Sequence, residues 1–185
     1  MIDETLLEAE EKMEKAIEFA RDEFANIRTG RANAAMFNKI LVDYYGAPTP
    51  LQQLASFNIP EARTVIINPF DRGATAGIIK AIRDSDLGVN PTDDGQIIRI
   101  NLPALTEDRR KDYVKMARSK AEDARITLRS LRHKAKDVME KAKKDGDVGE
   151  DEAVRGEKEL DSLTKRYVET IDELLAGKEK ELLEV

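Results

Sequence analysis

The chain has 185 residues, of which 37% are charged and 5% aromatic, and its formal net charge is −6. The absence of cysteine excludes disulfides, thiol nucleophiles and cysteine-ligated metals, and it favours a reducing compartment. No apolar run approaches the ~18 residues of a membrane span, and the N-terminus lacks the apolar stretch of a signal peptide, so we expect a soluble, cytoplasmic protein with no membrane partner.

The N-terminal segment predicts one long helix. None of the six prolines, which all lie between residues 48 and 103, interrupts it. Its apolar residues recur at steps of three and four, a period that is typical of helices packed along a shared seam. This seam comprises Leu6, Ala9, Met13, Ala16, Ile17, Ala20, Phe24 and Ile27.

The middle of the chain, residues 31–104, predicts a small domain with a different periodicity. Short runs of β-branched and apolar residues at 39–45, 64–67 and 96–102 are bounded by turn-forming residues and predict strands. Between the last two runs, residues 75–83 predict a short helix, and Asp71 is a plausible cap just upstream of it. We therefore expect an inserted β/α/β sandwich domain.

Two further helices are predicted after the insert. Their apolar residues again alternate steps of three and four, and the segment 145–149 separates the two helices. The seam of the second helix comprises Val114, Ala117, Ala121, Ala124, Leu128, Leu131, Ala135, Val138 and Ala142, and that of the third comprises Ala153, Gly156, Leu160, Leu163, Tyr167, Ile171, Leu174 and Leu182. With the first segment, these helices predict an elongated three-helix bundle.

The predicted fold class is therefore α+β, with two domains. Residues 1–30 and 105–185 form the bundle, and residues 31–104 form the inserted domain. Two short connecting segments, Thr29-Gly30-Arg31 and Pro103-Ala104-Leu105, join them and predict a hinge, because rigid bodies joined by few crossing contacts usually move relative to each other. A fixed angle, set by packing at the domain interface, is the alternative.

Basic charge is concentrated in the second predicted helix. Residues 106–144 carry a net charge of +7, whereas residues 1–29, 30–105 and 145–185 carry −5, 0 and −8. Two adjacent heptad positions hold many of these bases: an inner row of Lys111, Arg118, Arg125, Arg132 and Met139, and an outer row of Lys115, Glu122, Arg129, Lys136 and Lys143. Pairing with acidic residues of the other helices explains some of them but accounts poorly for the outer row. We therefore predict a surface for phosphate groups, most suited to structured RNA because few aromatics accompany it.

The sequence lacks the residues of a convincing catalytic site. His133 is the only histidine and lies between Arg132 and Lys134, in a pattern typical of a solvated helix face. No glycine-rich phosphate-binding motif is present. We predict a protein that is not an enzyme and uses no cofactor or metal, so that any nucleotide it depends on is hydrolysed by a partner.

Six segments match a known family in the expected order. They are Ile27–Ala32, Asp43–Leu51, Asn68–Arg72, Asp86–Pro91, Leu102–Lys111 and Leu128–Arg132. Through these motifs the chain resembles ribosome recycling factors over essentially its whole length. His133 is a departure, since the family often has a second arginine at that position.

The resemblance implies an L-shaped molecule in which the bundle and the sandwich domain are joined by a flexible double linker. It implies binding to the large ribosomal subunit after translation termination. With elongation factor G and its GTP hydrolysis, such a factor splits the post-termination complex so that mRNA and tRNA are released, and the inserted domain receives the push of this translocase.

The resemblance also implies roles for single residues. The central RNA-contacting arginine of the family matches Arg132, and Arg129 lies beside it. As further candidates for RNA contact, mainly through attraction of phosphates, we predict Arg125, Arg118 and Lys136 of the two rows, together with Arg28 and Arg31 outside them. We expect the protein to act as a monomer.

Another class of function stays open. A coiled-coil RNA-binding or adaptor protein without recycling activity would have similar helices and would bind a partner protein through its acidic faces. Indifference to ribosomes in a co-sedimentation experiment would distinguish it.

Overall fold

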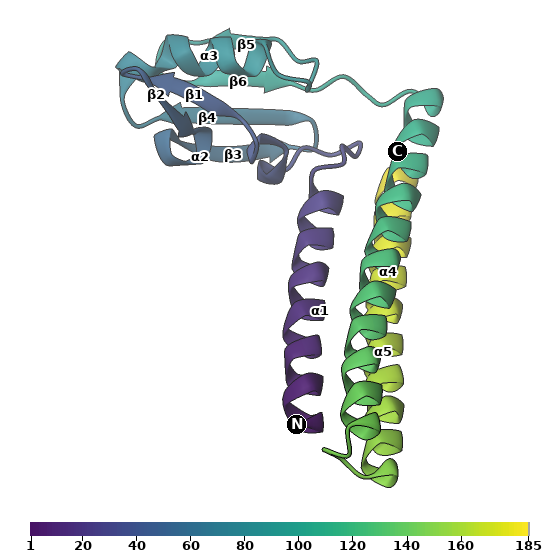
Figure 1. The fold of residues 1–185 in the computed structure, drawn as a ribbon. Coiled ribbons are helices and arrows are strands. Elements are labelled where there is room, and N and C mark those ends of the chain that lie inside the picture. The colour runs from purple at the N-terminus through teal and green to yellow at the C-terminus, as the bar shows by residue number, and fades with distance from the viewer. Residues whose placement is uncertain (185) are drawn as a thin grey trace. The chain divides into compact units, whose positions relative to one another are not determined.

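A computed structural model describes residues 1–184 of the chain (Figure 1). Its internal contacts divide the chain into two units. The helical unit comprises residues 1–24 and 114–180, and the mixed unit comprises residues 25–113 together with the C-terminal residues from Glu181. The α+β class predicted from the sequence is confirmed.

Three long helices build the helical unit. They are α1 (Ile2–Ala25), α4 (Glu107–Lys144) and α5 (Glu150–Leu183), and the last two are joined by a short turn. Gly146 in this turn has a φ of +77°, a conformation that glycine adopts without strain. The amide of Asp147 donates to the carbonyl of Ala142 at 2.9 Å, which satisfies one of the free carbonyls at the end of α4.

The buried face of α4 departs from the predicted seam at one position. Val138 is 50% exposed, whereas the following residue, Met139, is fully buried. The prediction for Val138 was therefore wrong. A straight α-helix has 3.6 residues per turn, so a strict 3.5-residue repeat drifts around its surface and over several heptads shifts by about one residue.

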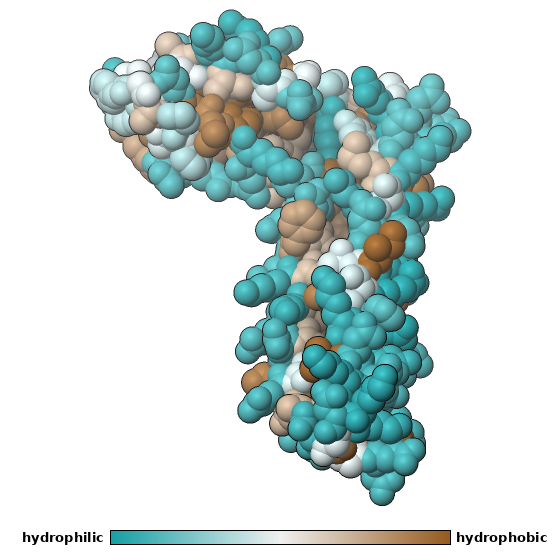
Figure 2. All heavy atoms as spheres, in the orientation of Figure 1, coloured by the Kyte–Doolittle hydropathy of each residue, from teal (hydrophilic) through white to brown (hydrophobic). Residues whose placement is uncertain are grey.

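Alanine-rich packing leaves a shallow groove between α1 and α4. The groove has a volume of about 460 Å³, and its lining includes Ala16, Ala20, Ala124 and Leu131. Figure 2 shows pale and brown atoms along the line between these helices, with hydrophilic atoms on either side. Small side chains bring the helices close together but bury little apolar area.

The mixed unit contains a two-stranded hairpin and a four-stranded antiparallel sheet of order β3-β4-β6-β5. The strands are β1 (Leu41–Tyr44), β2 (Ala47–Pro50), β3 (Ala55–Glu61), β4 (Thr64–Pro69), β5 (Pro91–Asp93) and β6 (Ile98–Asn101). The helices are α2 (Leu51–Leu54) and α3 (Thr75–Arg83), with 3₁₀ turns η1 (Ala34–Phe37) and η2 (Arg72–Ala74). A single core, which includes Phe37, Val65, Ile78 and Ile98, lies between these layers.

The predicted helix 75–83 is confirmed at both ends by α3, and each predicted strand contains or overlaps an observed one. Asp71 caps η2 rather than α3, because its carboxylate accepts from the amide of Gly73 at 2.9 Å. The sequence did not predict β2, β3 and β5. Each of these strands contains proline, which usually argues against a strand but is tolerated where the missing N–H would not pair.

Within the mixed unit, the two connecting segments join the sheet at the same turn. The amide of Ala32 donates to the carbonyl of Ala62 at 2.6 Å, and the amide of Leu102 donates to the neighbouring carbonyl of Arg63 at 2.7 Å. Within the described chain, residues 26–33 and 102–106 contain no strand. The turn between β3 and β4 thus anchors both connections.

Candidate nucleic-acid interface

The inner row of bases on α4 faces carboxylates of α5. Nε of Arg118 lies 2.7 Å from Oε1 of Glu179, and a terminal nitrogen of Arg125 lies 2.6 Å from Oδ1 of Asp172. Arg132 makes a longer contact of 3.4 Å, from Nη1 to Oδ1 of Asp161. Pairing between helices, which the sequence left open as an explanation, therefore accounts for much of this row.

Arg125 is the most enclosed of these side chains, with 20% of it exposed. Its guanidinium donates from both Nε and Nη2 to Asp172 and also pairs with Glu122 at 3.3 Å. The hydrogen bonds to Asp172, offset in part by burial, raise the pKa of Arg125 above its ordinary value. Arg125 has few donors left for an external phosphate, and its geometry indicates a role in holding α4 against α5.

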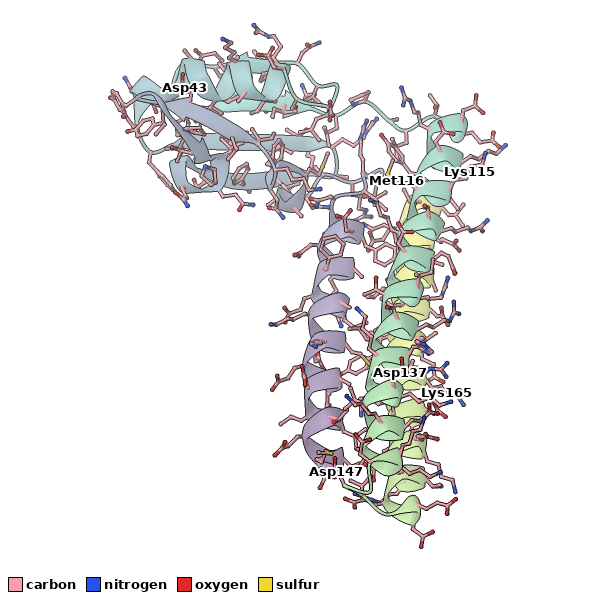
Figure 3. The ribbon with its side chains drawn as sticks, in the orientation of Figure 1. Asp43, Lys115, Met116, Asp137, Asp147 and Lys165 are labelled. Carbon is pink, nitrogen blue, oxygen red and sulfur yellow. The ribbon has the colours of Figure 1, made fainter. Side chains whose placement is uncertain are left out.

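The outer row is oriented differently. Arg129 pairs with Glu122 at 3.5 Å and Lys136 pairs with Glu140 at 3.9 Å, so both contacts lie on α4 itself. Figure 3 shows that Lys115, another member of this row, projects from a different side of α4 than Met116. Exposed pairs at such distances contribute little stability and exchange readily for another anion.

Arg132 combines exposure with an unsatisfied donor. Its side chain is 44% exposed, and its buried Nε has no hydrogen-bond partner among residues 1–184. A guanidinium carries five N–H donors in a planar fork, and although the buried Nε is closed to an external ligand, the single long contact of Nη1 to Asp161 leaves the terminal nitrogens available. Arg132 and Arg129 are therefore the arginines of α4 best prepared to bind a phosphate.

Arg28 and Arg31 lie in the mixed unit and not on α4. The half-buried guanidinium of Arg28 donates from Nη2 to the carbonyl of Pro103, which ties the first connecting segment to the second. Burial lowers the pKa of Arg28; the nearby Tyr113 partly offsets this effect and Arg109 reinforces it. Arg31 is exposed, and its backbone amide and carbonyl both bond to the hydroxyl of Thr29.

Arg110 is a candidate that the charge pattern did not single out, because it lies outside both rows. It is half-buried in the first turn of α4, and its buried Nε lacks a hydrogen-bond partner in the described part of the chain. The basic run Arg109-Arg110-Lys111 was the available signal, but only the fold shows that Arg110 keeps a free donor.

Other kinds of site find no support in residues 1–184. No cluster of three or more histidine, aspartate or glutamate side chains is arranged to hold a metal ion there. Over the same residues, no helix has the length and apolar character needed to cross a membrane.

Comparisons with known proteins agree on one family. The family model described as ribosome recycling factor matches residues 20–183. The ribosome-recycling factor of Kineococcus radiotolerans is 68% identical and that of Beutenbergia cavernae is 65% identical, each over 100% of both chains.

Two solved structures extend this agreement to the fold. A solution structure of the ribosome recycling factor is 38% identical, with a TM-score of 0.81 over 100% of this chain and 98% of that one. The other structure contains models for the T. thermophilus factor and the E. coli elongation factor G bound to the E. coli post-termination complex. Its matching chain is 40% identical, with a TM-score of 0.71 over 100% of both chains.

Proposed function

Because the chain belongs to the ribosome recycling factor family, we propose that it binds the large ribosomal subunit after termination and, with elongation factor G, splits the post-termination complex. GTP hydrolysis by elongation factor G supplies the energy, and mRNA and tRNA leave as a result. The protein itself is a non-catalytic factor in this scheme. The similarity to a factor placed in a post-termination complex with elongation factor G supports both partners.

The proposed RNA binding rests mainly on the exposure of the outer row of α4 and of Arg132. These side chains are exposed and held only by long contacts within the protein. A phosphate backbone can replace such contacts, because charge-assisted hydrogen bonds from a guanidinium fork to phosphate are short and strong. Arg129 and Arg132 therefore anchor the bundle on ribosomal RNA, and Lys136 and Arg118 add attraction.

We also propose that the two domains move relative to each other during splitting, with Thr29–Arg31 and Pro103–Leu105 as the hinge. Support comes from the connecting segments, which have no strand pairing of their own between the helices and the β3–β4 turn. Arg28 fits a role in keeping the two segments together through the Pro103 carbonyl.

Binding to isolated large subunits tests the RNA-binding part. We expect Arg132→Ala and Arg129→Ala each to weaken co-sedimentation about tenfold, in line with the loss of one or two charge-assisted bonds. Arg166→Ala is the matched control, since Arg166 is also an exposed arginine but pairs with Glu10 of α1 at 3.3 Å.

Far-UV circular dichroism should show unchanged helicity for all three variants. Equal binding by Arg132→Ala and the wild type would contradict the assigned interface. Failure of the wild-type protein to sediment with large subunits would instead favour the adaptor function.

A further inference from the structure

Exposed large apolar side chains occur on the hairpin formed by β1 and β2 and directly after β4, in the mixed unit. Tyr45, at the tip of the hairpin, is 83% exposed, and Leu41 on β1 is 58% exposed. Phe70, which follows β4, is 71% exposed. Large apolar side chains at this exposure are typical of surfaces that bind a partner when they are grouped and held in place.

Tyr45 occupies a backbone position that suits other residues better. Its φ is +50°, and Gly46 follows with a φ of +82°, the combination found in a tight hairpin turn. Asparagine, aspartate and glycine adopt the first of these positions readily, whereas a bulky aromatic residue does so rarely. Strained residues of this kind concentrate at functional sites, which points to a use for the Tyr45 ring itself.

The neighbouring side chains hold this ring group in place. The hydroxyl of Tyr44 donates to Oδ2 of Asp71 at 2.8 Å, and the amide of Gly73 donates to Oδ1 of the same carboxylate at 2.9 Å. The rings of Tyr44 and Tyr45 meet edge to face, with centroids 4.5 Å apart and an angle of 68° between their planes. A partner would therefore meet rings that are already ordered, which reduces the entropy lost on binding.

Side chains, rather than strand pairing, must make the contact. Pro48 and Pro50 lie on β2, and each lacks the N–H that an added strand would need. Val42 points inward, where it is fully buried and lies close to Gly77 of α3. The outward face of the hairpin carries Leu41 and Asp43 from β1, and Figure 3 shows Asp43 on this strand.

The charges around the rings favour a cation. Asp43 is exposed on the hairpin, and the hydrogen bonds from Tyr44 and Gly73 lower the pKa of Asp71, which favours the negatively charged form of that carboxylate. Arg72 is the basic residue next to this group and offsets only part of the negative charge. Electron-rich ring faces next to carboxylates attract guanidinium and ammonium groups and repel phosphates.

We propose that Tyr45, supported by Tyr44, Asp71 and Asp43, is a docking site for an arginine or lysine side chain on the protein partner that acts in the splitting step. The inference rests on the proposed function, because it requires that such a protein acts on this unit. RNA is the alternative occupant, and it would use the same rings for stacking.

The proposal is tested in a splitting assay on post-termination ribosomes with GTP present. Elongation factor G is titrated, and the extent of splitting is measured at each concentration. Tyr45→Asn removes the ring but keeps a residue that accepts the positive φ. It should raise the concentration of elongation factor G that gives half-maximal splitting about tenfold. Asp43→Lys should raise it severalfold by repelling the cation, whereas Tyr45→Phe should behave as wild type because it keeps the ring.

Phe19→Ala is the matched control, since Phe19 is an exposed aromatic residue on α1, 67% exposed, and it should leave the titration unchanged. Binding of all variants to isolated large subunits should equal that of the wild type. An unchanged titration for Tyr45→Asn would overturn the proposal, and so would a matching loss of large-subunit binding, which would indicate RNA. Failure of the wild-type protein to split ribosomes would contradict the proposed function itself.

Discussion

Among single residues, two glycines of α5 have opposite effects on stability. A Cβ atom at Gly156 would lie 2.7 Å from Cγ2 of Ile2 and 3.2 Å from the sulfur of Met139, both in the packed core. At Gly177 a Cβ atom would have no neighbour within 4 Å among the described residues. Gly156 is thus required by close packing between helices, whereas Gly177 only weakens the helix.

Alanine substitutions at the two positions should therefore shift stability in opposite directions. We expect Gly156→Ala to lower the free energy of unfolding by about 1–3 kcal/mol through overpacking. Gly177→Ala should raise it by about 0.5–1 kcal/mol through helix propensity. Urea unfolding followed by circular dichroism measures both. Equal midpoints for the two variants would contradict this packing arrangement.

Asp71 links stability to pH. Hydrogen bonds from Tyr44 and the Gly73 amide lower its pKa in the folded state, so its contribution is complete above the unfolded value of about 3.9 and is lost as the pH falls through the folded pKa. Asp71→Asn should therefore unfold at lower temperature than the wild type at pH 7, and the difference should shrink below pH 4. A difference independent of pH from 7 to 3 would argue against this role.

At the level of elements, α4 has one side that holds the bundle and another that is open to solvent. Arg125 and Arg129 lie one helical turn apart and carry the same charge, yet Arg125 bonds to Asp172 of α5, whereas the ion pair of Arg129 within residues 1–184 is with Glu122 of α4 itself. Their different neighbours indicate a structural role for the first residue and are the basis of the RNA contact that we propose for the second.

Arg125→Ala should therefore cost about 1 kcal/mol of stability with little loss of large-subunit binding. Arg129→Ala should leave the unfolding midpoint within about 0.5 kcal/mol of wild type while weakening binding. Chemical denaturation and co-sedimentation of both variants provide the comparison. If Arg125→Ala instead weakened binding and Arg129→Ala lowered stability, the inner row and not the outer row would face the RNA.

The long helices were predictable because a heptad pattern repeats along each of them, and α3 because its apolar positions follow the helical period. The proline-containing β2, β3 and β5 were not, because proline argues against a strand in the sequence, and only the register shows that the missing N–H groups are tolerated there. In the candidate interface, the charge pattern indicates Arg129 and Lys136. The enclosure of Arg125 by Asp172, the bond from Arg28 to Pro103 and the free Nε of Arg110 arise only from tertiary contacts.

For the whole molecule, the distribution of charge matters more than its sum. The net charge of −6 suggests poor affinity for nucleic acid, yet residues 106–144 alone carry +7. Carboxylates of α5 pair with much of the inner row. In the proposed function, the acidic charge limits indiscriminate RNA binding, and the exposed outer row makes the specific contacts.

Large-subunit binding should accordingly weaken as salt rises, because phosphate contacts release counterions. A dissociation constant measured between 50 and 200 mM monovalent salt should rise by at least tenfold if two or more bases contact phosphates, by the usual logarithmic dependence. Arg129→Ala should reduce the slope. A flat response would contradict a phosphate interface.

The proposal that this protein recycles ribosomes is tested most directly by subunit splitting. Purified post-termination ribosomes are mixed with elongation factor G and GTP, with and without the protein, and light scattering follows their separation. We predict rapid splitting only when all components are present, and slower splitting with Arg132→Ala at the same concentration. Ribosomes that remain intact with the wild-type protein, elongation factor G and GTP would contradict the account.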